Sequence, residues 1–475
     1  MKYTKRTLSF WRIGFAILLC GLLAPSVKAQ TTIKGTQNRA EVPVGFVGTV
    51  FLTNNVIRVP TNGASVLDAT GTNWVITPLT ITLTGAPAGL TATVADSNSN
   101  TVSLVPINMN TNNASQSTNV NVKLVFNGSE ASGIYPLVFN AAGGLTNDST
   151  VVTVEVGKIW NGPANTPLNG AGNWSDPSQW LGGVPGAGDH VIFTDLGMQT
   201  NNLMGYSSGT TNLLVNSIVN NSTTIASMRF SATNNVTNFA NIYINPGVTL
   251  TLNGSNGFTM LRDFGYFNSS KLNVFIAGTN GTFDVTNYNA NFSMMIDGQI
   301  ASVLDMSGLG NLRLDVNSLP IGDMLAYPNL LNYETNGYGS GSTLLSSLPQ
   351  KVLPTWKMAM TNYIRATYVD PYNYTNAGSR NYALVLGRNI VSGGSSGTDF
   401  QMSMGYSNVF YMDGICIAGY ASLGSALNFL NTNSYALFRG TNGGRMSVFA
   451  TADAAGGNYA NIILEIGRAS CRERV

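Results

Sequence analysis

Alternating apolar and polar positions mark the first third of the chain. Apolar side chains recur at every second position over 120–126 and again over 152–156. A period of two places one set of side chains on the buried face of a strand and the other set on the opposite face. Turn-forming residues at 85–89 and at Asn127-Gly128 separate such runs. The pattern predicts a small all-β domain over 41–157, built as an antiparallel sandwich.

Short apolar runs separated by Asn and Gly turns follow in the second part of the chain. They recur at intervals of roughly 20 to 30 residues without a helical period, which is typical of a solenoid. The runs lie at 225–230, 242–244, 248–252, 274–276, 283–285, 300–304 and 312–316. This pattern predicts a parallel β-helix, whose coils stack about 4.8 Å apart.

Residues 317–380 depart from this series, because they carry Tyr-rich and Pro-interrupted stretches such as 368–374. We expect an irregular excursion from the rod there. The strand pattern resumes at 382–387 as Tyr-Ala-Leu-Val-Leu-Gly and recurs at 435–440 as Tyr-Ala-Leu-Phe-Arg-Gly. The likeness predicts that these two segments hold equivalent positions on different coils.

Composition agrees with a β protein. Only 10% of the 475 residues are charged, whereas the chain contains 52 Gly and 56 Asn. Strong helix formers are scarce, which argues against a helical enzyme. The formal charge of +2 depends on the ends, because the chain without residues 1–29 and 466–475 has 16 cations against 21 anions. A nucleic-acid partner is therefore not expected, since binding to phosphates needs a clustered basic face.

Both ends of the chain differ from its body. Four cations precede the apolar run 13–24, and Val27-Lys28-Ala29 follows with small residues where a signal peptidase cuts. We interpret 1–29 as a secretory signal peptide, since twelve apolar residues are too few to span a membrane. Three Arg fall within 466–475, a string that resembles the translation of a sequencing adapter. We therefore expect the mature protein to be a fragment that contains no transmembrane segment. The part of the protein that would follow this fragment is expected to anchor it to the outer membrane.

Cysteine is too rare for a disulfide framework. Outside the two ends the body contains only Cys416, within the apolar stretch 414–418. An exported protein of this kind must be stabilised by packing and backbone ladders. We expect Cys416 to act as a small buried hydrophobic residue.

Two motifs resemble known families of exported proteins. The segment 133–139, followed by Ala141-Ala142-Gly143-Gly144, resembles the penultimate strand of bacterial immunoglobulin-like domains. The resemblance implies an immunoglobulin-like β-sandwich over 30–157. Three Trp, a Val-Pro-Gly segment, Gly188-Asp189 and a Phe follow in a fixed order between 158 and 193. This set is similar to the opening coil of the autotransporter-associated β-helix proteins.

The second resemblance implies that residues 158–465 form a right-handed parallel β-helix. The three Trp residues, which are Trp160, Trp174 and Trp180, would then cover the open end of the solenoid core. An alternative is that their rings form a stacking platform for glycans. The two interpretations differ in whether the rings are buried.

Candidate catalytic chemistry is sparse. His190 is the only histidine, so a zinc site built on His residues is excluded and a serine triad would depend on this one residue. Gly-x-Ser-x-Gly occurs at 205–209 and 393–397 within Gly/Ser-rich loops, where we interpret it as chance. We assign no catalytic, cofactor-binding or metal-binding residue, and we expect no cofactor.

A polysaccharide lyase or glycoside hydrolase on a β-helix is the enzymatic alternative. Its carboxylates could converge across coils from Asp284, Asp297, Asp305 and Asp315, although no two are adjacent in sequence. Within the excursion, the candidates for such chemistry are Lys357, Arg365 and Asp370, because binding residues are often carried on loops.

The favoured function is not enzymatic. We expect an exported structural or adhesive β-solenoid at the cell surface or outside the cell, a truncated passenger of the autotransporter type. Its partners would be surface glycans or other surface proteins, contacted through Asn, Thr, Ser and Tyr side chains. A third alternative is a glycan-binding sandwich on a passive stalk.

Overall fold

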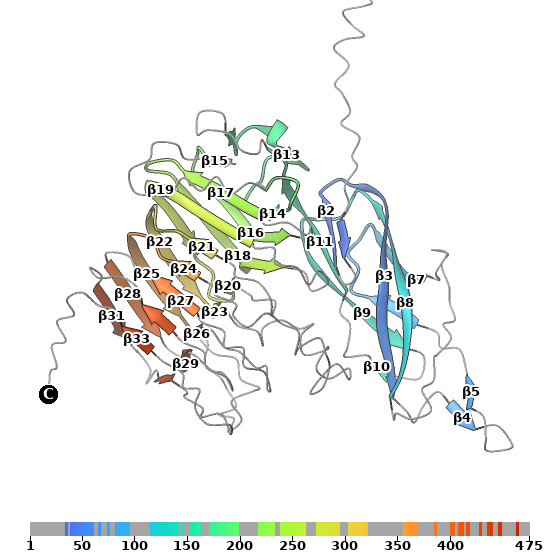
Figure 1. The fold of residues 1–475 in the computed structure, drawn as a ribbon. Helices are drawn as coiled ribbons and strands as arrows, with labels where there is room; N and C mark the ends of the chain where they lie inside the picture. The colour runs from blue at the N-terminus through green and yellow to red at the C-terminus, as the bar shows by residue number, and fades with distance from the viewer. Residues whose placement is uncertain are drawn as a thin grey trace, which may run out of the picture. The chain divides into compact units, whose positions relative to one another are not determined.

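The chain is all-β in the computed structural model, which confirms that prediction. Its only helical element among the described residues is the short 3-10 turn η2 (Pro177–Gln179). Most strands join one large sheet system in which parallel pairing predominates (Figure 1). The described residues are 34–36, 39–60, 65–67, 74–76, 81–95, 115–141, 145–146, 152–162, 171–198, 217–232, 238–262, 272–294, 303–321, 355–367, 384–386, 400–403, 407–412, 415–418, 427–429, 435–439, 445–448 and 462–464.

Several predictions from the sequence concern residues outside this set. The signal peptide at 1–29, the tail at 466–475 and the candidates Asp297 and Asp370 all lie outside the described residues. The same holds for the side chain of Cys416, although its backbone belongs to a described strand.

The N-terminal part is built on two sheets. The first contains β3 (Val47–Pro60), β8 (Ser115–Asn127) and β7 (Leu90–Ala95), all antiparallel. The second places β11 (Val152–Trp160) between β2 (Arg39–Pro43), which is parallel to it, and β9 (Gly133–Ala141), which is antiparallel. Further strands pair at the margins or separately: β1 (Lys34–Thr36), β4 (Ser65–Leu67), β5 (Trp74–Ile76), β6 (Ile81–Thr84) and β10 (Leu145–Thr146).

The period of two explains which side chains these sheets bury. Val122, Leu124 and Phe126 are buried on β8, whereas Val125 between them is exposed. The predicted Asn127-Gly128 turn follows, where Gly128 has a φ of 87° that favours glycine. The Glu130 carboxylate accepts hydrogen bonds from the backbone N–H groups of both turn residues, at 2.9 and 3.0 Å.

Strand β11 belongs to two sheet systems at once. Its residues 152–156 pair with β9 and 153–157 with β2, as described above. Its last residues pair instead with β13 (Trp180–Leu181), antiparallel, and with β14 (His190–Phe193), parallel. A single continuous strand therefore carries the chain from the N-terminal sheets into the parallel strands that follow.

The parallel strands form three ladders. The first ladder contains β12 (Gly172–Asn173), β15 (Ser217–Val219), β17 (Asn238–Ile244), the start of β19 (Leu272–Val285), β21 (Val303–Asp305), β24 (Thr355–Lys357), β27 (Phe400–Ser403), β30 (Leu427–Phe429) and β33 (Ile462–Leu464). The second ladder contains the starts of β16 (Thr223–Ala232) and β18 (Thr249–Arg262), the end of β19, β22 (Leu309–Val316), β25 (Thr361–Ala366), β28 (Ser407–Met412) and β31 (Tyr435–Arg439). The third ladder contains β14, the ends of β16 and β18, β20 (Phe292–Met294), β23 (Leu319–Ile321), β26 (Leu384–Leu386), β29 (Ile415–Ala418) and β32 (Arg445–Val448).

The chain visits the three ladders in a repeating order. β21, β22 and β23 enter the first, second and third ladder in turn, and β24, β25 and β26 then pair with them in the same order. Strands β23, β24 and β25 fall within 317–380, the span predicted as an excursion, while 322–354 and 368–383 lie outside the described residues. The predicted equivalence of 382–387 and 435–440 is wrong, because β26 lies in the third ladder and β31 in the second.

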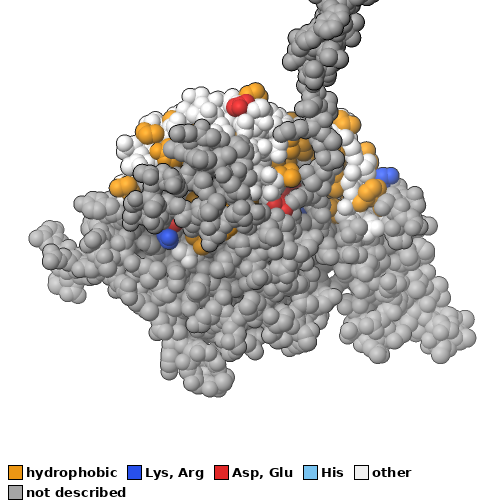
Figure 2. All heavy atoms as spheres, turned by 45° about the horizontal axis from the view of Figure 1, so that its top comes forward, with side chains coloured by type: hydrophobic (Ala, Val, Ile, Leu, Met, Phe, Trp, Pro, Cys, Tyr) orange, Lys and Arg blue, Asp and Glu red, His pale blue; other side chains and the backbone are white. Residues whose placement is uncertain are grey.

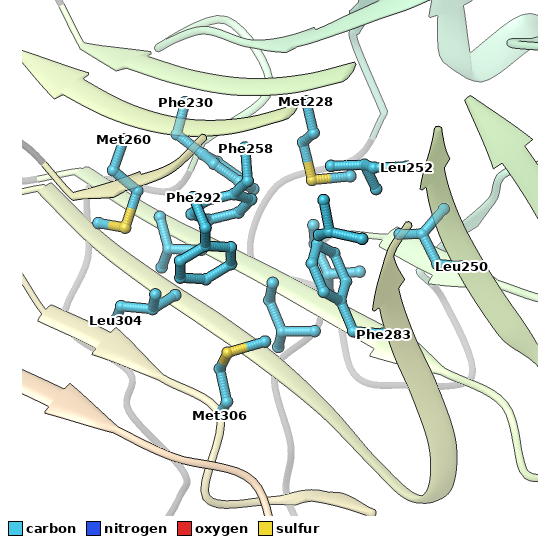
Figure 3. Close-up of a cluster of buried hydrophobic side chains, with 14 of the residues drawn as sticks. Met228, Phe230, Leu250, Leu252, Phe258, Met260, Phe283, Phe292, Leu304 and Met306 are labelled. Atoms are coloured by element: carbon cyan, nitrogen blue, oxygen red, sulfur yellow. The ribbon is translucent and has the colours of Figure 1, made fainter. Parts of the chain in front are cut away.

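Inward-facing side chains of the ladders meet in one apolar core (Figure 3). Because parallel strands pair in register, similar side chains stack from one strand to the next, as Leu252, Val285 and Leu314 do in the second ladder. A column of aromatic rings runs through this core, with successive centroid distances of 6.1, 5.0, 5.6, 4.5 and 5.9 Å. Its members are Trp160, Phe193, Phe230, Phe258, Phe292 and Trp356.

The aromatic column leads to a test of core packing. Phe258 is fully buried and stacks on Phe292, with an angle of 12° between the rings. We expect Phe258→Ala to lower the free energy of unfolding by about 3 to 5 kcal/mol, because it removes apolar contacts and leaves a cavity. Denaturant unfolding followed by near-ultraviolet circular dichroism measures the change. Val47→Ala, on a side chain that is 69% exposed, is the control and should leave the transition almost unchanged.

Candidate functional site

The three Trp residues of the opening motif are buried together. Trp180 lies 4.8 Å from Trp160 and 5.1 Å from Trp174 between ring centroids, in edge-to-face contacts. The Trp180 Nε1 donates a hydrogen bond of 2.9 Å to the Trp174 carbonyl oxygen. All three rings pack against Phe193. No face of these rings is open to a glycan in this structure, so they act as part of the core.

A buried charged cluster lies at the shared strand β11. Glu155 is fully buried there, and both Arg229 of β16 and Arg39 of β2 form ion pairs with its carboxylate. The Arg39 Nε lies 3.4 Å from the Glu155 Oε1. Glu41, which stands beside Glu155 in the parallel pairing of β2 and β11, has its Oε1 3.7 Å from the Arg229 Nε. The cluster therefore joins strands of the N-terminal sheet to a strand of the ladders.

His190 completes the cluster from β14. Its Nε2 lies 3.3 Å from the Glu155 Oε2, and its Nδ1 lies 2.7 Å from the Ser227 Oγ. A neutral imidazole with its proton on Nε2 satisfies both contacts, because it donates to the carboxylate and accepts from the hydroxyl. The His190 backbone N–H donates to the Ser132 Oγ at 2.8 Å. The backbone of β14 also comes close to β11 at Gly157, which has no side chain. A Cβ there would lie 2.6 Å from the His190 carbonyl oxygen.

Charge pairing keeps Glu155 ionised despite its burial. Burial alone raises the pKa of this carboxyl group, but Arg229 and Arg39 outweigh that effect. With a further contribution from His190, they lower the pKa from 4.5 to about 2. Breaking a buried pair by removing one partner is costly, because the other charge is left without compensation.

Ser227, His190 and Glu155 have the residue types of a hydrolytic triad, but their location excludes that role. Their exposed fractions are 1%, 2% and 0%, so a substrate cannot reach the Ser227 Oγ in this structure. The hydroxyl group lies within the third ladder, where Ser227 pairs with His190 in register. The contacts of this cluster are those of a structural junction.

A second polar cluster lies on the outward face of the second ladder. Asp284 of β19 pairs in register with Arg313 of β22, which pairs with Tyr363 of β25. The Arg313 guanidinium donates two hydrogen bonds to the Asp315 carboxylate, 3.0 Å from Nε and 2.7 Å from Nη2. Burial, together with the neighbouring Asp315, raises the pKa of Asp284, and Arg313 partly opposes this effect.

Of the acidic residues singled out in the sequence, the structure brings Asp284 and Asp315 to one face. It places Asp305 on the first ladder, where its carboxylate accepts hydrogen bonds from the Lys357 Nζ at 2.8 Å and from the Ser307 Oγ at 2.6 Å. Lys357 and Arg365, the candidates predicted in the excursion, lie on β24 and β25. They belong to different ladders, so strand pairing does not bring them side by side.

Sequence reasoning missed the residues that pair with Glu155. Arg39 and Arg229 carry no motif, and neither is near Glu155 in sequence. The one usable signal was that Glu155 alternates with buried valines. That alternation predicts which face of the strand carries the Glu155 side chain. It does not predict which strand packs against this face.

Comparisons with known proteins give no match to a family model, to a curated protein or to a solved structure. Among the described residues, no helix has the length and apolar character needed to cross a membrane. Within the same ranges, no three His, Cys, Asp or Glu side chains are grouped so that they could hold a metal ion.

Glu155 provides a test of the junction. We expect Glu155→Gln to lower the free energy of unfolding by about 3 to 5 kcal/mol, because it removes the fully buried carboxylate with which both Arg229 and Arg39 form ion pairs. Asp189→Asn is a matched control next to His190, since an amide oxygen can still accept the bond from the Gly186 N–H. Urea unfolding compares the two variants. Equal stability of wild type and Glu155→Gln would contradict the role of the cluster.

The pKa of Glu155 predicts how stability depends on pH. Because the pKa is about 2 when folded and 4.5 in its ordinary state, ionised Glu155 stabilises the fold fully above pH 4.5. This contribution, about 3 kcal/mol, is lost as the pH falls from about 4.5 to about 2. The difference in stability between wild type and Glu155→Gln should therefore shrink over that interval. A difference that stays constant down to pH 2.5 would argue against this assignment.

Proposed function

We propose that this protein is exported to the cell surface and acts there as a structural or adhesive solenoid. In this proposal an immunoglobulin-like β-sandwich over 30–157 precedes a right-handed parallel β-helix over 158–465, as in a passenger of the autotransporter type. The observation that carries the proposal is the repeating order in which the chain visits three parallel ladders. A chain that adds one strand to each ladder per turn is what a β-helix requires.

The surface chemistry supports a binding role over a catalytic one. Most of the described surface visible in Figure 2 belongs to the backbone or to side chains that are neither apolar nor charged, with scattered apolar groups and few charges. Inward positions of the ladders are apolar, so the outward positions are free to vary in chemistry without disturbing the core. Such a rod presents repeated hydroxyl and amide groups to a glycan or to another surface protein.

A polysaccharide-cleaving β-helix is a second candidate with one observation in its favour. Asp284 and Asp315 lie on one face, roughly 8 Å apart at the backbone given the strand spacing and rise of a parallel sheet, and a pair of carboxylates on one face is what glycosidases use. The raised pKa of Asp284 suits a general acid. However, Asp315 is only 4% exposed and is held by Arg313. A water molecule could not be activated there, so binding fits this face better than hydrolysis.

The third candidate, a glycan-binding sandwich, has little support. Phe51 is the exposed aromatic side chain on the described parts of β3 and β8, and its exposed neighbours Val47 and Val125 are aliphatic. A stacking platform for sugars needs aromatic faces.

Export is tested in a Gram-negative host that expresses the full chain. We expect the mature protein to begin at Gln30 by mass spectrometry and to be labelled on intact cells by an antibody against residues 158–465. Arg6→Glu together with Arg12→Glu, which reverses the charge of the leader, should reduce export strongly. A full-length chain that keeps residues 1–29 and stays inside the cell would refute the proposal.

A further inference from the structure

We propose that the outward face of β19, β22 and β25 is a binding site for neutral oligosaccharides. Arg313 and Asp284 would hydrogen-bond to sugar hydroxyl groups, and Tyr288 would stack on the apolar face of a sugar ring. The inference rests on the proposed surface function and specifies where on the solenoid a glycan is held.

Arg313 is held in place while its donors remain accessible. Two of its N–H groups are used by Asp315, and its Cζ lies 5.8 Å from the centroid of the Tyr363 ring. Its side chain is nevertheless 55% exposed. A guanidinium group has five N–H donors, so donors remain for a ligand after both bonds to Asp315 have formed.

Tyr288 is the exposed aromatic group of this face. It follows β19 in the chain and is 50% exposed. The Arg365 Cζ lies 5.6 Å from its ring centroid, so Arg365 lies over one face of the ring while half of the side chain remains exposed. Arg365 is in register with Asp315, which places Tyr288 beside the Arg313–Asp315 pair.

The pairing of neighbouring strands places further polar side chains on the same face as Arg313 and Tyr288. Asp284 stands beside Arg313 on the neighbouring strand, so the backbones that carry an acceptor and a donor lie about 4.8 Å apart across the ladder. In the adjacent outward row, the Asn311 Nδ2 donates a hydrogen bond of 3.4 Å to the Thr282 Oγ1. The face thus offers closely spaced donors and acceptors on a rigid sheet.

The balance of charges identifies the class of ligand. Asp284 and Asp315 offset Arg313 and Arg365 in formal charge, so the face exerts no net attraction on an ionic ligand. Neutral sugars present hydroxyl groups at their edges and C–H groups on their faces, which matches paired polar groups beside an aromatic ring. Because contacts within the protein already fix Arg313 and Tyr288, little side-chain entropy is lost on binding.

The test uses the purified mature chain with an array of neutral oligosaccharides, comprising hexamers of glucose, mannose, galactose and N-acetylglucosamine, and with polygalacturonate as the anionic probe. We expect binding to at least one neutral hexamer. Tyr288→Ala and Arg313→Ala should each weaken that binding about tenfold or more, and Arg313→Lys should recover part of it. Isothermal titration calorimetry measures the dissociation constants, and thermal unfolding verifies that each variant is folded.

Lys357→Ala is the matched control, because it removes an exposed cation of the first ladder and should leave glycan binding unchanged. The inference is overturned if no neutral hexamer binds, if polygalacturonate binds more tightly than every neutral hexamer, or if Tyr288→Ala and Arg313→Ala bind like the wild type. Any of these results together with a labelled cell surface rejects this site alone. Failure of export rejects the proposed function instead.

Discussion

The ion pair between Glu155 and Arg229 constrains the rest of the architecture. A fully buried carboxylate must have compensating charges, and Glu155 obtains them from β2 on one side and from β16 on the other. Its third partner, His190, comes from β14. These contacts require β2, β11, β14 and β16 to keep one relative register, so the first strands of the ladders are fixed to the N-terminal sheet. Every later strand inherits that register through parallel pairing.

Parallel pairing then determines both the core and the surface. Inward rows of the second ladder contain Leu252, Val285 and Leu314, which continue the same kind of side chain from strand to strand. On the outward face of the ladder, neighbouring strands carry side chains of different chemistry, such as Asp284 beside Arg313. The interior is therefore repetitive and the exterior is locally specific. A site can arise on such a face by changing outward residues alone.

Part of this structure could be predicted from the sequence. The all-β class followed from composition and alternation, and the burial of Val152, Val154 and Val156 followed from their period of two. The pairing of Asp284 with Arg313 could not be predicted, because coils of unequal length hide the register from the sequence spacing. The same reason explains why the two Tyr-Ala-Leu segments, although alike, lie in different ladders. Similarity over six residues reports strand propensity and not the position of a strand on a coil.

Strand β11 also has a mechanical consequence. Separately folded domains are commonly joined by an exposed linker that can bend, but here the connection is itself a paired strand with partners over 152–160. Tension applied between the two sheet systems would load the hydrogen bonds along β11 in shear, and many bonds would have to break together. This connection would therefore transmit force from one sheet system to the other without a compliant joint.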